Sequence, residues 1–567
     1  MDNDAQSGKP MQSPMKHGIN ARLGQIKAEL LAPRNRLLLL IIAIFVVVRA
    51  INLSNAYLWY DDVASIGSFA KTDWGDILSS SVDHVLVISG PFIPTVVGRI
   101  LLNIFGPHLI VLRLPNLCAS LLSLLLLFAI STRLFPNSRL RYLPGLLFTF
   151  SIPSILYSQG LQPSIFFFLS TCIQLWYFVK MISEVRQRGS REVVFRHIQL
   201  FTRISVLTFF INYMSVLVYA PMMLSYFTWI VLRREPRKSS IPDKSIASLF
   251  AEVALEAVPL GALTYLRWHL FVKSHGGDSI LGYLQNELFP KTVAQFARAL
   301  YDALSYHFNF SYSPDIYTPW GANVASLPFV ILCLLGALYF FFKHKERLAF
   351  LIIAIVYIVL IGFFEIIPLG GVRHSFTFAP FAYLAIGFGM GAIRDYGNRL
   401  RLPDKTESRV GISLIIIMTV TFGTSGVNIY RHRRSSINLD ELVRLSQHYN
   451  VDLIIGYQET KSILTAMIHT QKDNLYDHAF RLKTYNEETH QELTETFLLV
   501  TNRYLFDPNP EWPIADVTKI PGDAFQNYTV TPLIEEIGPL DPFAPVQSIY
   551  YPINGFFVYL VEPSLSN

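Results

Sequence analysis

The chain has 567 residues, of which 51% are hydrophobic and 16% are charged, and its formal net charge is +6. Long apolar runs recur from residue 37 to residue 427, and many approach the roughly twenty residues that cross a bilayer, which excludes an array of soluble domains. The basic residues lie between these runs, where they set membrane orientation, so nucleic-acid binding is not expected and a polytopic α-helical membrane protein is predicted.

Residues 1–36 are polar and predict a cytoplasmic N-terminal arm without a cleavable signal peptide. The first span follows at Leu37–Leu53, and a long outer loop occupies residues 54–107. Within this loop, Phe92–Phe105 is apolar but short and contains Arg99, which favours a helix lying in the membrane interface. A second outer loop, residues 273–320, has apolar side chains on one helical face and predicts another interfacial helix or a lid over a cavity.

Hydropathy predicts about eleven spans in a transmembrane domain of residues 37–427. After the first span they are His108–Thr132, Tyr142–Tyr157, Pro163–Lys180, Ile198–Asn212, Val216–Leu232, Ile246–Val272, Gly321–Phe342, Leu348–Phe364, His374–Ile393 and Gly411–Val427.

Loop charges fix the orientation of these spans. With a cytoplasmic N-terminus, the inside connections 133–141, 181–197, 233–245, 343–347 and 394–410 each carry several Arg or Lys residues. The outside connections 158–162 and 213–215 carry none, and 365–373 carries only Arg373. This alternation follows the positive-inside rule. Both long loops and the C-terminal region are therefore expected outside the cytoplasm.

From residue 428 to residue 567 the chain is less hydropathic and predicts a small extracytoplasmic α/β domain. Helical stretches are expected near Leu439–Tyr449 and Lys461–Met467. Strand-like runs occur at Val451–Tyr457, Thr496–Val500, Tyr528–Ile534 and Gly555–Val561.

Two adjacent carboxylates, Asp61 and Asp62, follow the first span directly, beside Trp59 and Tyr60. Aspartate is poorly tolerated next to hydrocarbon, which makes the pair a candidate functional site. An interfacial aromatic belt with an Asp helix cap would produce the same residues, so both interpretations stay open at this point.

Four short motifs occur in order on the predicted outer face. They are Leu58-Trp59-Tyr60-Asp61-Asp62-Val63-Ala64, Phe105-Gly106 with Leu112-Arg113-Leu114-Pro115, Tyr157-Ser158-Gln159, and Gly371-Val372-Arg373-His374 running into Pro380. Together they resemble the polyprenyl-phosphate-sugar-dependent membrane glycosyltransferases of superfamily C (GT-C), in the branch of protein O-mannosyltransferases and aminoarabinose transferases. This resemblance implies a polyprenyl-phosphate sugar donor and an extracytoplasmic glycolipid, polysaccharide or protein acceptor.

The chemistry of such a donor requires one base. A departing phosphate is weakly basic and needs no proton, so the two-carboxylate arrangement of glycosidases is unnecessary. One carboxylate can remove the acceptor hydroxyl's proton during an inverting displacement. Asp61 matches the family's first acidic position and is the candidate base. Asp62 would orient the acceptor or the base, or share in holding a divalent cation if one is used.

Cations are expected where the phosphate departs. Arg373 is the first candidate because a guanidinium grips phosphate oxygens with two parallel hydrogen bonds, and His374 beside it could donate as well. Arg113 and Arg99 are weaker candidates, since snorkelling to the interface explains either one equally well. The remaining candidate substrate contacts, for which packing or an incidental position is the alternative, are Tyr60, His84, Tyr157 and Gln159.

Two other functions stay open on the sequence. After Tyr-Ser-Gln the family often has Glu, a small residue and Arg, where this chain has Gly160, Leu161 and Gln162. A catalytically silent scaffold of a cell-envelope glycan machine is therefore one alternative, and a lipid-linked sugar transporter is another. The compact layout with short loops predicts a bacterial plasma-membrane protein.

Overall fold

The computed structural model describes about half of the chain's length in detail, mostly its helices and the C-terminal sheet. The described ranges are 36–51, 53, 92–106, 108–136, 138–161, 164–188, 191–212, 215–232, 251, 254–266, 292–310, 324–343, 373–400, 403, 406–432, 439–457, 481–485, 495–501, 527–537 and 555–564. The predicted cytoplasmic arm, Tyr60, Asp61, Asp62, His84, the predicted span Leu348–Phe364 and the predicted helix Lys461–Met467 lie outside these ranges.

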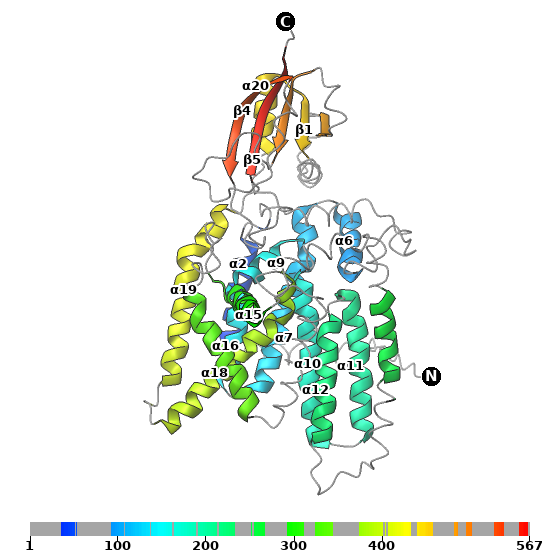
Figure 1. Ribbon diagram of the computed structural model, residues 1–567, viewed down its shortest axis with the longest axis vertical. Helices are drawn as coiled ribbons and strands as arrows, with labels where there is room; N and C mark the ends of the chain where they lie inside the picture. The colour runs from blue at the N-terminus through cyan, green and yellow to red at the C-terminus, as the bar shows by residue number, and fades with distance from the viewer. Residues whose placement is uncertain are drawn as a thin grey trace, which may run out of the picture.

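The chain is an integral membrane protein built as a bundle of helices (Figure 1). Among the described residues, five helices are long and apolar enough to cross a membrane, while the total of eleven spans stays a prediction. The first half contains α2 (Arg36–Ala50), α6 (Phe92–Phe105), α7 (Leu109–Leu134), η2 (Arg139–Tyr142), α8 (Leu143–Phe150), α9 (Ile152–Gln159), α10 (Ser164–Arg188), α11 (Arg191–Ile211) and α12 (Ser215–Leu232).

The second half of the bundle continues the same architecture. A short apolar helix at Ala254–Leu266 is followed by α15 (Val293–His307), η3 (Val324–Ser326), α16 (Leu327–Lys343), η4 (Arg373–Phe378), α18 (Ala379–Arg399) and α19 (Thr406–His432). The next helix, α20 (Leu439–Tyr449), lies beside the C-terminal sheet (Figure 1). Figure 1 shows α15 nearly end-on while α10, α11 and α12 run along the long axis, so α15 crosses the direction of the bundle. The helix predicted in the second outer loop is therefore present.

The α15 helix has a defined start and a buried end. The Thr292 side chain accepts a hydrogen bond from the Gln295 backbone, and the Gln295 side chain accepts one from the Thr292 backbone, which forms a capping box. At the other end Tyr306, His307 and Phe308 are buried in the bundle core. This helix therefore carries its C-terminal residues from the surface into the protein.

Glycine allows two helices of the bundle, α16 and α18, to approach closely. A Cβ atom built on Gly336 would lie 1.7 Å from the Ala385 carbonyl oxygen, and one on Gly389 would lie 2.3 Å from the Leu332 carbonyl oxygen. Small residues at such crossings are the usual way for membrane helices to pack tightly. This contact fixes α18, and with it the η4 turn that leads into α18.

The C-terminal domain is a five-stranded mixed sheet in the order β2-β1-β3-β5-β4. Strand β1 pairs in parallel with β2 and β3, whereas β5 pairs antiparallel with β3 and β4. Figure 1 shows the sheet beyond one end of the helix bundle. The strands are β1 (Leu453–Tyr457), β2 (Arg481–Tyr485), β3 (Phe497–Thr501), β4 (Tyr528–Ile537) and β5 (Gly555–Pro563).

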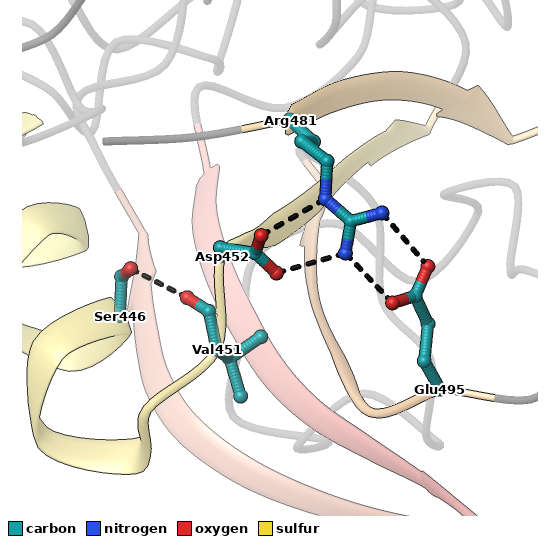
Figure 2. A network of polar contacts seen from close by, with 5 residues as sticks. All are labelled: Ser446, Val451, Asp452, Arg481 and Glu495. Carbon is teal, nitrogen blue, oxygen red and sulfur yellow. Dashed lines mark hydrogen bonds and ion pairs between the residues drawn. The ribbon is translucent and has the colours of Figure 1, made fainter. Parts of the chain in front are cut away.

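An arginine ties together the starts of the three parallel strands (Figure 2). Arg481, the first residue of β2, donates hydrogen bonds from Nε and Nη2 to both oxygens of Asp452, each at 2.9 Å. Its Nη2 also donates to Glu495 at 2.7 Å, just before β3. The hydrogen bonds from Arg481 hold the pKa of the Asp452 carboxyl below its usual value. Strand β2, which hydropathy alone did not predict, is thus held in register by its charges.

Candidate functional site

The candidate site lies where the ends of α2, α9, α15 and η4 meet the first half of α7. Figure 1 shows α2, α6 and α9 in the part of the bundle nearer the sheet. The chain enters the aspartate-bearing outer loop at the end of α2, and the predicted phosphate-binding pair begins η4. The contacts among these ends decide what the site can do.

A broken helix forms the base of the site. The predicted span Tyr142–Tyr157 is two short helices, α8 and α9, separated at Ser151, whose φ of −63° and ψ of 122° are extended. Pro153 follows in the first turn of α9 and has no N–H to continue the α8 ladder. The Ile152 N–H donates instead to the Asn309 carbonyl at 2.8 Å, so the carbonyls at the end of α8 need other donors.

Arg49 supplies these donors from the neighbouring helix α2. Its Nη2 donates to the Phe148 carbonyl at 3.0 Å and to the Ser154 hydroxyl at 2.6 Å, and its Nη1 donates to the Thr149 carbonyl at 3.2 Å. The guanidinium lies over the Phe45 ring, with its central carbon 3.7 Å from the ring centroid. Arg49 is fully buried. A buried charge is tolerated when it is hydrogen-bonded in this way.

The end of α2 is capped by side chains from α9 and α7. Gln159, at the end of α9, donates from Nε2 to the carbonyls of Arg49 at 2.6 Å and Ile51 at 3.1 Å. Arg113 of α7 donates from Nη1 to the Leu53 carbonyl at 2.6 Å. Only the amide nitrogen can donate to two carbonyls, so the orientation of the Gln159 amide follows from its partners. The start of the outer loop is therefore fixed by two other helices.

The same helices are joined to α15 and η4. Tyr157 and Tyr306 are hydrogen-bonded through their hydroxyl groups, and the Tyr157 ring lies 5.0 Å from that of Phe376 in η4. The His307 carbonyl accepts hydrogen bonds from the Ser151 hydroxyl at 3.0 Å and the Tyr383 hydroxyl at 3.2 Å. The position of η4 relative to α9 is thus set by buried aromatic and polar contacts.

The predicted site residues divide into three groups. The structure brings Tyr157, Gln159 and Arg113 together as buried residues, each with a protein contact. Arg373 and His374 are the first two residues of η4. Arg99 is half-buried on α6. Tyr60, Asp61, Asp62 and His84 lie outside the described residues.

Two residues that contact the candidate site, Arg49 and Asn116, were not identified from the sequence. Asn116 of α7 donates from Nδ2 to the Gly160 carbonyl at 2.8 Å and to the Tyr157 carbonyl at 3.3 Å, which anchors the end of α9. An arginine near the end of an apolar run was a usable signal, because a charge at that depth needs a partner. Among the described residues, three or more His, Cys, Asp or Glu residues do not gather as a metal site.

Comparison with known proteins gives a likeness of fold. No protein-family description and no curated protein matches the chain. The crystal structure of ArnT from Cupriavidus metallidurans in the apo state is similar at 12% identity, covering 83% of this chain and 93% of ArnT, with a TM-score of 0.46. The Archaeoglobus fulgidus oligosaccharyltransferase in complex with Zn and sulfate is similar at 11% identity over 82% and 67% of the two chains, with a TM-score of 0.45.

A second ArnT structure, bound to undecaprenyl phosphate, is similar at 13% identity over 82% of this chain and 92% of ArnT, with a TM-score of 0.44. At these identities and scores the likeness concerns helix arrangement and says nothing of individual residues or substrates in this chain.

Proposed function

We propose that the chain is an integral-membrane glycosyltransferase that moves a sugar from a polyprenyl-phosphate donor to an acceptor outside the cytoplasm. One observation carries the proposal. Side chains from distant parts of the sequence cap the end of α2 at Arg49, Ile51 and Leu53, eight residues before Asp61, and bring this end beside the helix end that carries Gln159. Arg113 of the second sequence motif and Gln159 of the third thus cap the end of the helix that precedes the first motif, which contains Asp61.

The proposed reaction is a single displacement. The acceptor oxygen attacks the anomeric carbon, Asp61 takes the acceptor's proton, and the bond from that carbon to the phosphate oxygen breaks with inversion. The electron pair of the broken bond leaves with the lipid phosphate. Arg373 binds this phosphate, with His374 as a further donor. Asp62 orients the acceptor or Asp61, or contributes to a divalent cation site if the enzyme uses one.

Electrostatics support a phosphate at this end of the bundle. Arg49 and Arg113 are both fully buried; Arg49 lies in the last turn of α2, and Arg113 donates to the Leu53 carbonyl just beyond it. Fixed positive charge in a water-poor environment acts strongly on an anion that forms nearby. A departing lipid phosphate beside this pair gains a favourable field without any rearrangement of the protein. The same field disfavours a cationic substrate.

The test is sugar transfer by the full chain in lipid nanodiscs. Radiolabelled polyprenyl-phosphate mannose, glucose and arabinose would serve as donors, and a glycan-bearing membrane extract would serve as acceptor. We expect transfer from one of these donors and a loss of at least about a hundredfold in Asp61→Asn, because a general base contributes 10²–10⁴-fold. Asp452→Asn, in the sheet domain, is the control. Full transfer by Asp61→Asn would exclude the proposed base.

A catalytically silent scaffold is the second candidate, and one sequence feature favours it. Gly160, Leu161 and Gln162 replace the charged segment that the family often has after Tyr-Ser-Gln. Without that segment the chain could hold a polyprenyl-phosphate sugar and leave it intact. Saturable binding of a labelled donor to wild-type nanodiscs, with no sugar transferred to any fraction of the extract, would favour the scaffold over the enzyme.

A further inference from the structure

We infer that Gln159 is a positioning residue for the transfer reaction, acting through the end of α2. This inference rests on the proposed function. Its basis is that both amide N–H groups available on Nε2 are directed at carbonyls of α2, those of Arg49 and Ile51, although Gln159 belongs to a helix more than a hundred residues further along the chain.

Helix packing does not require these hydrogen bonds. Val48 of α2 already packs with Ile152 and Ile155 of α9 in an apolar cluster, with Phe422 of α19 against it. These contacts hold the two helices side by side by burying apolar surface. A nonpolar residue at position 159 would preserve that packing. The amide therefore gives direction to the chain leaving α2, in addition to the stability that its two hydrogen bonds contribute.

Gln159 orients the carbonyl groups at the end of α2. The last carbonyls of a helix have no partner within the helix, and their hydrogen bonds decide the path of the chain beyond it. The Ile51 N–H donates to the Val47 carbonyl at 3.2 Å, which continues the helix, whereas Gln159 donates to the carbonyls of Arg49 and Ile51. Arg113 then binds the Leu53 carbonyl. Hydrogen bonds from two other helices thus fix the carbonyls of Arg49, Ile51 and Leu53.

Gln159 is itself held so that it can act as a fixed point. Its side chain is fully buried, and the backbone around it is anchored by Asn116, which donates to the Tyr157 and Gly160 carbonyls. The preceding turn is fixed to α15 through the hydroxyl contact between Tyr157 and Tyr306. A rigid support of this kind transmits a defined position to the segment that it binds.

A positioning role for Gln159 predicts a change in kcat without a change in the donor KM. Misplacing a reacting group by about an ångström can lower the rate about a hundredfold even when the mutation is remote. Gln159→Met keeps the length of the side chain and removes both N–H donors. We expect at least about a tenfold lower kcat in this variant, with a donor KM close to that of the wild type, because donor binding depends on other groups.

Gln174 offers a matched control. It is a fully buried glutamine that also donates from Nε2 to two acceptors, the Ser205 hydroxyl and the Ser215 carbonyl, both at 3.1 Å. It joins α10 to α11 and α12. Gln174→Met should lower the melting temperature about as much as Gln159→Met does, since each loses two buried hydrogen bonds. Its kcat should stay within twofold of the wild type.

The experiment compares both variants with Asp61→Asn in nanodiscs, using the same labelled polyprenyl-phosphate mannose, glucose and arabinose. Equal kcat values for Gln159→Met and Gln174→Met would overturn the inference while leaving the proposed function intact. Absence of transfer by the wild type would overturn both. If Gln159→Met does not fold, Gln159→Asn decides: its shorter amide cannot reach both carbonyls, so a kcat at least threefold below wild type supports the inference and an unchanged kcat refutes it.

Discussion

Replacing Gly336 by alanine should push α16 and α18 apart. The new Cβ atom would lie 1.7 Å from the Ala385 carbonyl oxygen, more than an ångström closer than Cβ atoms approach other heavy atoms. The obstacle is backbone, which cannot rotate away as a side chain can. Overpacking of a well-packed core lowers the free energy of unfolding by about 1–3 kcal/mol. We expect Gly336→Ala to cost about 3 kcal/mol because two backbones must separate.

The separation should also reach the candidate site. Helix α18 begins directly after η4, whose Phe376 packs against Tyr157. We therefore expect a lower transfer rate from Gly336→Ala in addition to a lower melting temperature. Thermal unfolding followed by size-exclusion chromatography in detergent would measure the stability change.

A glycine without close neighbours supplies the control for this measurement. A Cβ atom on Gly423 of α19 would meet nothing within 4 Å, so Gly423→Ala should be neutral or slightly stabilising. If Gly336→Ala melts at the same temperature as Gly423→Ala, the close approach of α16 and α18 is wrong, and the argument for a displaced η4 fails with it.

Three further predictions concern other parts of the chain. Thr292→Ala should cost about 1 kcal/mol at the start of α15 by removing the capping box with Gln295, seen as faster hydrogen exchange there and unchanged exchange in α16. Hydrogen bonds from Arg481 lower the pKa of the Asp452 carboxyl. The ion pair therefore stabilises the sheet above the unfolded-state pKa of about 3.9, and this stabilisation is lost as the pH falls through the folded-state pKa. Arg481→Met should remove this acid dependence from unfolding of the sheet, and an unchanged dependence would contradict the prediction. Arg49→Met removes a donor from the buried Phe148 and Thr149 carbonyls, the first of which also accepts a hydrogen bond from the Ser154 hydroxyl. The melting temperature should fall because an unsatisfied buried carbonyl costs about 1–3 kcal/mol, and an unchanged melting temperature would disprove the role of Arg49.

The helices were predictable because hydropathy acts locally. The helix predicted at Phe92–Phe105 has the same bounds as α6, and the helix predicted near Leu439–Tyr449 has those of α20. Strand β2 was not predicted, because its sequence Arg-Leu-Lys-Thr-Tyr is mostly polar and its place depends on Asp452 and Glu495. Pairing partners of that kind are distant in sequence, and periodicity does not contain them.

The break between α8 and α9 shows a second limit of the sequence. Residues 142–157 are mostly apolar and contain no charged residue, so a hydropathy window predicts one span there. Pro153 was visible, but proline is tolerated within membrane helices when other groups satisfy the freed backbone. Whether the helix continues or breaks is decided by Arg49 and Asn309, which lie about a hundred residues or more away.

The sequence identified three residues that the structure brings together, but it did not identify their contacts. Tyr157, Gln159 and Arg113 were identified from motifs, and the structure brings them together. Their expected partners were substrate groups, whereas their described partners are protein atoms. A motif identifies a candidate residue. The fold then shows whether its side chain is bonded to protein atoms, as in a positioning role, or is directed at a ligand.

The buried Arg49 and the broken helix depend on each other. An uninterrupted helix through Ser151 would use the Phe148 and Thr149 carbonyls internally, and the guanidinium would then lose acceptors that offset the cost of its burial. Without Arg49, the break would leave these carbonyls short of donors in a nonpolar environment. Each feature therefore makes the other tolerable. A charge retained at this cost, near the end of the helix that precedes Asp61 in the sequence, supports the proposed site where a lipid phosphate departs.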